Sequence, residues 1–419
     1  MAPTQSNTCG QLNVLGGPRI FASHSPLLIT STCFLWTYNA TRDTENTALS
    51  HAQCALAFPD LNYEIDRAKS YWQKRGHRIT QQDTNIAWRP DGAFRLLIVD
   101  NQLRILETKG AWMSSGYRYR THPTLHQIYR ALLGATAAGE MLPNIEFAVT
   151  VDDMSLIPAG GEDDTRTIWA YARRLNVTED ERLWLIPEFS FFTWPPIGGH
   201  FSEMQRKARV YDAPVRDKIH QLVWRGAIWT NGPIREGLVA ATADKPWANV
   251  AEASRKNQPS NLIPTDEMCR WEFLAHTEGR SWSGRLLFLL NCNSIPVVHD
   301  LKWTTIFYHL LKPSGPEQNY MPVRRDWSDL EEKITHFLAN PDEAQRIADN
   351  AVAQFRSRYT SPAAEACYWR NLIRGWSEVA FDPEVYETVT VEYGGKTVEK
   401  QQLRGVAFEE FTWIPSGQA

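Results

Sequence analysis

Short runs of consecutive apolar residues, separated by segments with helical spacing, recur in both halves of the chain. The clearest runs are 145–151 (IEFAVTV) and 294–298 (SIPVV). Runs of this length are typical of strands buried on both faces of a parallel sheet. Leu125, Ile128 and Leu132 lie at helical spacing before the first of them. Strands that alternate with helices predict an α/β fold with parallel sheets and right-handed crossovers.

The length of 419 residues is too large for one ordinary domain. We expect two α/β halves with a cleft between them, linked within 195–219, where Pro, Gly and mixed charge concentrate. The first 50 residues show no clear periodicity and are predicted to be poorly structured. Near the C-terminus, Gly394-Gly395 separates two strand-like segments and predicts a hairpin.

Smaller signals mark individual elements. Asp60 is expected to cap a helix that ends before Gly76, and Asp100-Asn101 is expected to join two adjacent strands. Ser328 and Glu331 match a capping box, and Asn340-Pro341 is expected to start another helix.

Composition excludes several classes of protein. The chain is 43% hydrophobic and 22% charged, which is typical of a globular fold rather than a disordered chain. The net charge of −4 argues against a nucleic-acid polymer as partner. The apolar stretch 26–38 is about half a membrane span, and no basic segment precedes it. We therefore expect no clear signal peptide or transmembrane helix.

The cysteines and histidines favour neither a metal centre nor a dense disulfide framework. Six cysteines are scattered without a C-x-x-C pair, so we expect no structural metal and no bound cofactor. In an oxidising compartment, Cys9, Cys33 and Cys54 are candidates for pairing with one another. The 17 tryptophans mildly favour a carbohydrate ligand.

The segment 278–290 (EGRSWSGRLLFLL) carries the most chemical information. A strand runs into a turn containing Gly279, Arg280, Ser281 and Ser283, and a helix is expected over 284–290. Free N–H groups at a helix start, together with Arg285 in its first turn, favour a bound anion. An ordinary turn with a solvated arginine fits the spacing equally well. It is not a P-loop, because G-x-x-x-x-G-K-[ST] is absent.

Two further predicted strands are followed by residues suited to ligand binding or catalysis. Gly226 (in WRG, 224–226) permits close approach of a ligand, and Arg235 follows at a distance that allows it to reach a phosphate. Asp152 and Asp153 follow the apolar run 145–151, at the edge where ligands of parallel sheets bind. One of them is a candidate general base. Surface arginines and a helix-capping aspartate are the alternative interpretations.

These segments together resemble glycosyltransferase family 90, the family of fungal capsule-associated xylosyltransferases and animal protein O-glucosyltransferases. The resemblance spans about 55–380 and rests on the following segments: VDDM at 151–154, WRGA at 224–227, EFLAHTEGRSWSGRLLFLLNCNSIPVV at 272–298, YMPVRRDWSDLEEKI at 320–334 and CYWRNLI at 367–373. The block at 272–298 is specific in length and order, whereas the others are weak singly.

The resemblance implies a GT-B fold of two facing Rossmann-like domains, a UDP-sugar donor and inversion at the anomeric carbon. It implies an acceptor domain 51–200, a donor domain 201–362 and a helix 363–380 crossing back. The extension 1–50, expected to be poorly structured, and the hairpin extension 381–419 come from the residue patterns, and the hairpin lies outside the family's common core. Asp153 matches the catalytic aspartate. Arg235, Arg285 and Gly279 to Ser283 match donor-binding positions, and Asp152 and Trp194 are acceptor-side candidates.

We therefore expect glucose or xylose to be transferred to a hydroxyl of a glycan or protein. No D-x-D motif occurs, so arginines and a helix N-terminus are expected to stabilise the diphosphate without a metal. The alternatives are a non-catalytic carbohydrate- or nucleotide-binding member of the same fold, and a metal-assisted transferase. The resemblance implies the secretory pathway, although the chain ends in IPSGQA without a retention signal.

Overall fold

The computed structural model describes residues 36–112, 116–155, 157, 164–195, 197–253 and 259–412. Thr37–Ala419 form one compact unit, and of the separate unit Met1–Trp36 only Trp36 is described. The prediction for 1–50 therefore lies largely outside the described residues. Within its described part, Asn39 caps a short helix, α1 (Ala40–Asp43).

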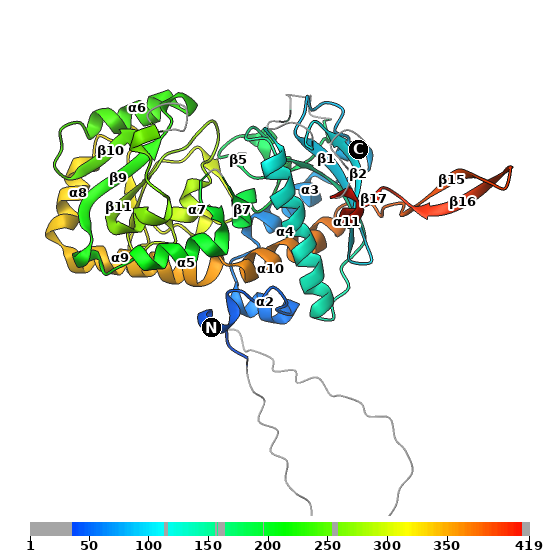
Figure 1. Ribbon diagram of the computed structural model, residues 1–419, viewed down its shortest axis with the longest axis horizontal. Helices are drawn as coiled ribbons and strands as arrows, with labels where there is room; N and C mark the ends of the chain where they lie inside the picture. Colours follow the sequence, from blue (N-terminus) through cyan, green and yellow to red (C-terminus); the bar gives the residue numbers. More distant parts are fainter. Residues whose placement is uncertain are drawn as a thin grey trace, which may run out of the picture. The chain divides into compact units, whose positions relative to one another are not determined.

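The first half is built on a six-stranded sheet with the order β17-β2-β1-β3-β4-β6. Its strands are β1 (Ala93–Val99), β2 (Gln102–Lys109), β3 (Ile145–Thr150), β4 (Trp169–Ala170), β6 (Trp184–Leu185) and β17 (Val406–Ala407). The helices of this half are α2 (His51–Ala57), α3 (Tyr63–Arg75) and α4 (Arg118–Ala137). Figure 1 shows α4 beside β1 and β2, and α4 contacts β2.

This first sheet is mixed rather than parallel, which corrects the prediction for this half. Asp100 and Asn101 have φ values of 51° and 58°, so they turn β1 directly into an antiparallel partner, β2. β1 also pairs antiparallel with β3, and only the β3–β4–β6 side is parallel. The tight connection therefore decided the strand direction.

The second half contains a five-stranded sheet that is parallel throughout, as predicted. Its order is β10-β9-β11-β12-β14. The strands are β9 (Ile219–Gly226), β10 (Ala248–Glu252), β11 (Trp271–His276), β12 (Ile295–His299) and β14 (Met321–Val323). The helices are α5 (Phe201–Tyr211), α6 (Gly232–Ala241), α7 (Arg285–Leu289), α8 (Leu330–Ala339) and α9 (Pro341–Gln354).

Two of the predicted helix starts are displaced. α3 begins at Tyr63 behind Asn62, not behind Asp60. The capping box at Ser328 is wrong, because α8 follows Asp329 without a side-chain cap. A capping box does occur at Ser50, whose hydroxyl and Gln53 satisfy the start of α2. The predicted start of α9 at Asn340-Pro341 is confirmed.

A long buried helix, α10 (Pro362–Ser377), follows the second half and packs on α4, α3 and β3 of the first. Its Trp376 indole donates to the Glu146 carbonyl at 3.1 Å, and Trp369 donates to the Gln127 side chain at 3.2 Å. A small ladder between β5 (Arg173–Arg174) and β13 (Trp303–Thr304) joins the halves at another point. The compact unit is therefore tied together across its length.

Two disulfides occur in the described chain, and the sequence analysis identified neither. Cys54 of α2 is bonded to Cys367 of α10, and Cys269 is bonded to Cys292. The expected pairing of Cys54 with Cys9 or Cys33 is wrong. The two partners are 313 residues apart, so only the return of α10 to the first half brings them together.

The C-terminal hairpin consists of β15 (Tyr386–Tyr393) and β16 (Lys396–Leu403), which meet at Gly394-Gly395 as the sequence predicts. It extends away from the rest of the compact unit (Figure 1). Arg104 of β2 anchors the base of the hairpin by donating to the carbonyls of Arg404 and Gly405.

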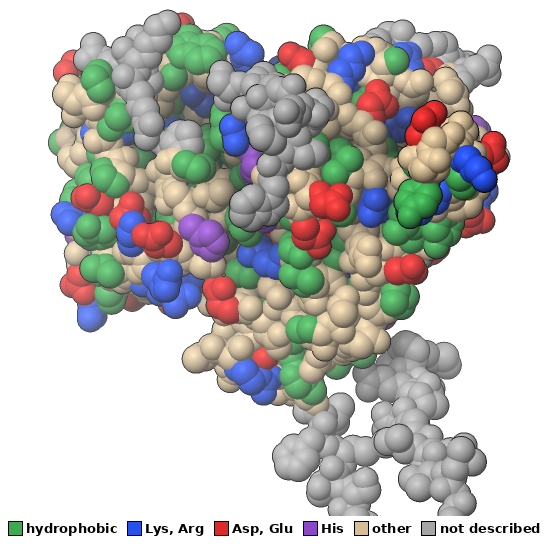
Figure 2. All heavy atoms as spheres, turned by 45° about the vertical axis from the view of Figure 1, so that its right-hand side comes forward, with side chains coloured by type: hydrophobic (Ala, Val, Ile, Leu, Met, Phe, Trp, Pro, Cys, Tyr) green, Lys and Arg blue, Asp and Glu red, His purple; other side chains and the backbone are tan. Residues whose placement is uncertain are grey.

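Figure 2 shows acidic and basic side chains mixed over the visible face, with no extended patch of one sign.

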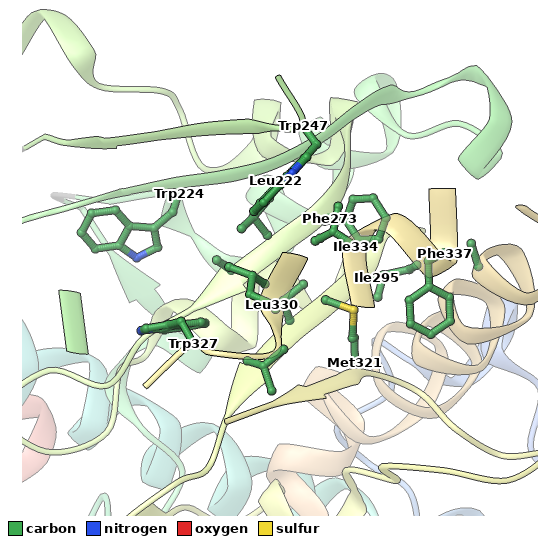
Figure 3. Packing of buried hydrophobic residues seen from close by; sticks show 14 of the residues in the cluster. Leu222, Trp224, Trp247, Phe273, Ile295, Met321, Trp327, Leu330, Ile334 and Phe337 are labelled. Carbon is green, nitrogen blue, oxygen red and sulfur yellow. The ribbon is translucent and has the colours of Figure 1, made fainter. Parts of the chain in front are cut away.

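The core of the second half connects the sheet to the candidate site. It lies between β9, β11, β12 and β14 and the helices α6, α8 and α9, and Figure 3 shows its larger side chains. Trp224 lies at one end of this cluster and is 1% exposed. Trp327 fixes α6 on the cluster by donating to the Ile234 carbonyl at 2.9 Å. One face of Trp224 is therefore part of the core, and the ring is held rigidly.

We predict that the Cys54–Cys367 bond stabilises the fold more than Cys269–Cys292. A cross-link over 313 residues restricts the unfolded chain more than one over 23. The chain-entropy model puts the difference at about 2 kcal/mol. Calorimetric unfolding of C54A/C367A and C269A/C292A measures it. Equal losses in the two variants would contradict the prediction.

Candidate active site

Two arginines from different elements meet over one tryptophan ring at the carboxyl end of β9. The guanidinium carbons of Arg235 (α6) and Arg285 (α7) lie 5.8 and 5.9 Å from the centroid of the Trp224 ring. Arg235 is 6% exposed, and it donates to the carbonyls of Glu278 and Ala227 at 3.1 and 2.7 Å. The Nη1 of Arg285 is buried without a hydrogen-bond partner.

No carboxylate compensates these two charges within the part of the chain that the structure describes. Burial, and then the charge of Arg285, lowers the pKa of Arg235 to about 9. Burial alone lowers the pKa of Arg285 to about 10. Both groups remain protonated at neutral pH. Because buried charges without counter-ions are costly, this arrangement favours an anionic ligand between them.

His276, at the end of β11, adds no positive charge to this region. Burial, and then its neighbours His299, Arg285 and Arg235, hold the pKa of His276 well below its usual value. The ring is therefore neutral beside the two arginines. The sequence analysis did not select it, since a lone histidine at a strand end is not a signal.

Gly226 is the close-approach position that the sequence predicts. A Cβ at this residue would lie 2.7 Å from the Trp224 ring and 3.3 Å from the Arg285 Nη1. Only glycine therefore allows Trp224 and Arg285 to lie as they do. Gly279 lies beside the other arginine, because a Cβ there would be 3.6 Å from the Arg235 Nη2.

The 279–284 turn closes on itself, with the Gly279 N–H directed to the carbonyls of Ser281 and Trp282 at 3.1 and 3.4 Å. Ser281 is buried, and its hydroxyl has no hydrogen-bond partner. Ser283 is half-buried. Arg280 instead lies outside the cluster, exposed over the Trp229 ring. Of the predicted donor-binding residues, it is the only one that is exposed.

The helix after this turn is shorter than the predicted 284–290. α7 spans five residues behind Gly284 and has no side-chain cap. So short a helix carries little macrodipole. The positive charge of the site therefore comes chiefly from Arg235 and Arg285.

The structure distinguishes the two aspartates after β3. Asp152 is held on both oxygens, by the Arg89 Nη2 at 2.8 Å and by the Met154 N–H at 3.2 Å. Asp153 contacts Arg120 through Oδ1 at 3.0 Å, and its side chain is 36% exposed. Among the described residues, none donates a hydrogen bond to its Oδ2. Asp153 is thus the carboxylate with a free oxygen.

Aromatic side chains connect Asp153 to the 279–284 turn. Arg120 lies 5.7 Å from the Phe189 ring, Phe189 lies 5.6 Å from Tyr171, and Tyr171 lies 5.4 Å from Trp282. Trp194, the acceptor-side candidate, packs edge-on against Phe189 at 5.4 Å. A continuous series of contacts therefore runs from Asp153 and Trp194 of the first half to the 279–284 turn of the second.

Glu188 is a residue of this network that the sequence analysis missed. It precedes the short helix η3 (Phe189–Phe191), is 2% exposed, and accepts a hydrogen bond from the Trp282 indole. Burial raises the pKa of Glu188 to about 7, against the opposing effect of Trp282. The titratable side chains that face it, Tyr171 and Tyr308, have raised pKa values and are neutral. A single Glu in an aromatic segment does not indicate from the sequence that its side chain is buried against Trp282.

Two features concern ligands and membranes. Within the described ranges, no three His, Cys, Asp or Glu side chains come together as a metal site would require. No helix in the described part of the chain has the length and apolarity needed to cross a bilayer.

Comparison with known proteins shows the family to which this chain belongs. The model of glycosyl transferase family 90 matches residues 52–404, so the chain is a member of that family.

Named relatives include protein O-glucosyltransferase 1 of Bos taurus, which is 25% identical over 259 residues, 57% of this chain and 63% of the relative. The O-glucosyltransferase LpsA of Dichelobacter nodosus is 27% identical over 156 residues, 36% of this chain and 48% of the relative. The O-glucosyltransferase rumi homolog of Anopheles gambiae is 28% identical over 122 residues, 29% of this chain and 30% of the relative. The chain thus spans less than two thirds of these relatives.

We predict that the stability of the wild type falls relative to E188Q as the pH rises. The folded pKa of about 7 lies above the ordinary value of 4.5. The stabilisation is therefore complete below about pH 4.5 and is lost as the pH rises to 7. Gln cannot ionise, so E188Q should gain on the order of 3 kcal/mol relative to wild type between pH 4.5 and 8. Denaturant unfolding at both pH values tests this, and a constant difference would refute it.

Proposed function

We propose that this chain is an inverting glycosyltransferase that moves glucose or xylose from a UDP-sugar to a hydroxyl of a glycan or protein. The supporting observation is the pair of uncompensated guanidinium groups over Trp224, 5.8 and 5.9 Å from its ring. A nucleoside diphosphate is the anion that a transferase must stabilise as it leaves, and fixed arginines do this electrostatically. The relatives named as O-glucosyltransferases favour UDP-glucose as the first donor to test.

In the proposed reaction, the acceptor hydroxyl lies between Asp153 and the anomeric carbon. The free Oδ2 of Asp153 removes the hydroxyl proton as the oxygen attacks and the C–O bond to the diphosphate breaks. Arg120 holds the carboxylate in place through Oδ1 at 3.0 Å. The electron pair of the broken bond remains on UDP, and Arg235 and Arg285 neutralise the charge of its diphosphate.

The proposed compartment follows from the cysteines. Both disulfides of the described chain persist only in an oxidising environment. This supports the secretory pathway. Their reduction in the native protein isolated from cells would contradict it.

We predict that D153N abolishes transfer while UDP affinity stays nearly unchanged. Loss of a general base costs roughly 10²–10⁴ in rate, and Asp153 makes no contact with Arg235 or Arg285. D152N is the matched control, because Asp152 is already occupied by Arg89. Initial rates with a panel of UDP-sugars, read by mass spectrometry, together with UDP calorimetry, test this. Wild-type turnover in D153N would show that Asp153 is not the general base.

We predict that R285A weakens UDP binding and slows transfer. The expected loss of transition-state stabilisation is about 3 kcal/mol. R280A is the control, because the Arg280 guanidinium lies outward over Trp229. A chelator in the same assay tests for help from a divalent cation. UDP binding by wild type without turnover of any UDP-sugar would indicate a binding module, and equal effects of R285A and R280A would remove the proposed anion site.

A further inference from the structure

One buried glutamate of the described chain lacks the basic partner that the other buried glutamates have. Six are buried, and five are paired with a basic side chain: Glu64 with Arg67 and Arg173, Glu146 with Arg95 and Arg404, Glu272 with His220, Glu278 with Arg325, and Glu365 with Arg130. Glu188 has no basic partner among the described residues. A buried carboxyl without a cation is costly, so its position calls for a reason other than stability.

The side chain of Glu188 reaches from the first half into the 279–284 turn of the second. Its Oε2 accepts the hydrogen bond of the Trp282 indole. The same oxygen would lie 2.7 Å from a Cβ at Gly284, so glycine at that position is required for the contact. Gln127 of α4 holds the main chain by donating to the Glu188 carbonyl at 3.0 Å. Both ends of the contact are therefore fixed.

The next residue faces the other part of the site. Phe189 contacts Arg120 at 5.7 Å, and Arg120 binds Asp153 at 3.0 Å. Of two successive residues, one thus contacts the proposed diphosphate-binding turn and the other contacts Arg120, the arginine that binds the proposed base. A shift of residues 188–189 would change the relation between Asp153 and Arg285, the residue that directly follows the turn.

We propose that Glu188 is a positioning residue that docks the 279–284 turn, through Trp282, at the correct distance from the catalytic side of the first half. The inference rests on the proposed function and extends it to a residue that does not touch the donor. Loss of the contact should release the turn, because Trp282 would lose the partner of its buried N–H. Arg285 would then be less well placed for the diphosphate, and both donor binding and transfer would weaken.

The experiment compares E188A, E188Q, W282F and the double variant E188A/W282F. We expect E188A to raise the donor KM and the Kd for UDP about tenfold, the usual effect of one lost buried hydrogen bond. E188Q keeps an acceptor oxygen and should stay within about threefold of wild type. W282F keeps the ring but lacks the N–H, so it should resemble E188A. The double variant should be no worse than either single one.

E272Q provides the matched control. Glu272 is equally buried at 2%, but it lies at the start of β11, away from the turn. A merely structural effect, as in this control, lowers the amount of folded protein and leaves KM and the UDP Kd unchanged.

Three outcomes would overturn the positioning role: unchanged UDP affinity in E188A, no rescue in E188Q, or additive losses in the double variant. If E188A fails to fold, W282F and E188Q decide the question. Absence of UDP binding by the wild type would overturn the proposed function as well. Wild-type binding with an unchanged W282F would overturn the positioning role alone.

Discussion

Two positive charges without a counter-ion among the described residues impose the main constraint on this molecule. Arg235 and Arg285 lie over the same tryptophan ring, and rigid packing keeps them there. Trp224 provides that rigidity, since its ring belongs to the core of the second sheet (Figure 3). Gly226 removes the side chain that would otherwise occupy the same space. Trp224 thus belongs both to the hydrophobic core and to the arginine cluster of the candidate site.

The site depends on the first half as much as on the second. The long helix α10 returns to α4 and β3, and the Cys54–Cys367 bond fixes that return. The β5–β13 ladder adds a second connection. The contact from Glu188 to Trp282 joins the halves at the site itself.

The two neighbouring aspartates show why residue type is not enough to assign a role. Asp152 and Asp153 are equivalent in the sequence, but Arg89 and the Met154 N–H use both oxygens of the first. The second has one oxygen to which none of the described residues donates, and it is more exposed. This difference follows from which arginine each side chain meets, and those arginines come from distant segments.

The sequence by itself determined most of the local elements. The apolar runs predicted β3 and β12, the alternation with helices predicted the parallel second sheet, and Gly394-Gly395 predicted the hairpin, because these depend on neighbours along the chain. Tertiary structure alone decided the antiparallel pairing of β1 with β3, the pairing of Cys54 with Cys367, the outward position of Arg280 and the burial of Glu188. Each of these depends on contacts between residues far apart in sequence, and no local pattern encodes the free energy of such contacts.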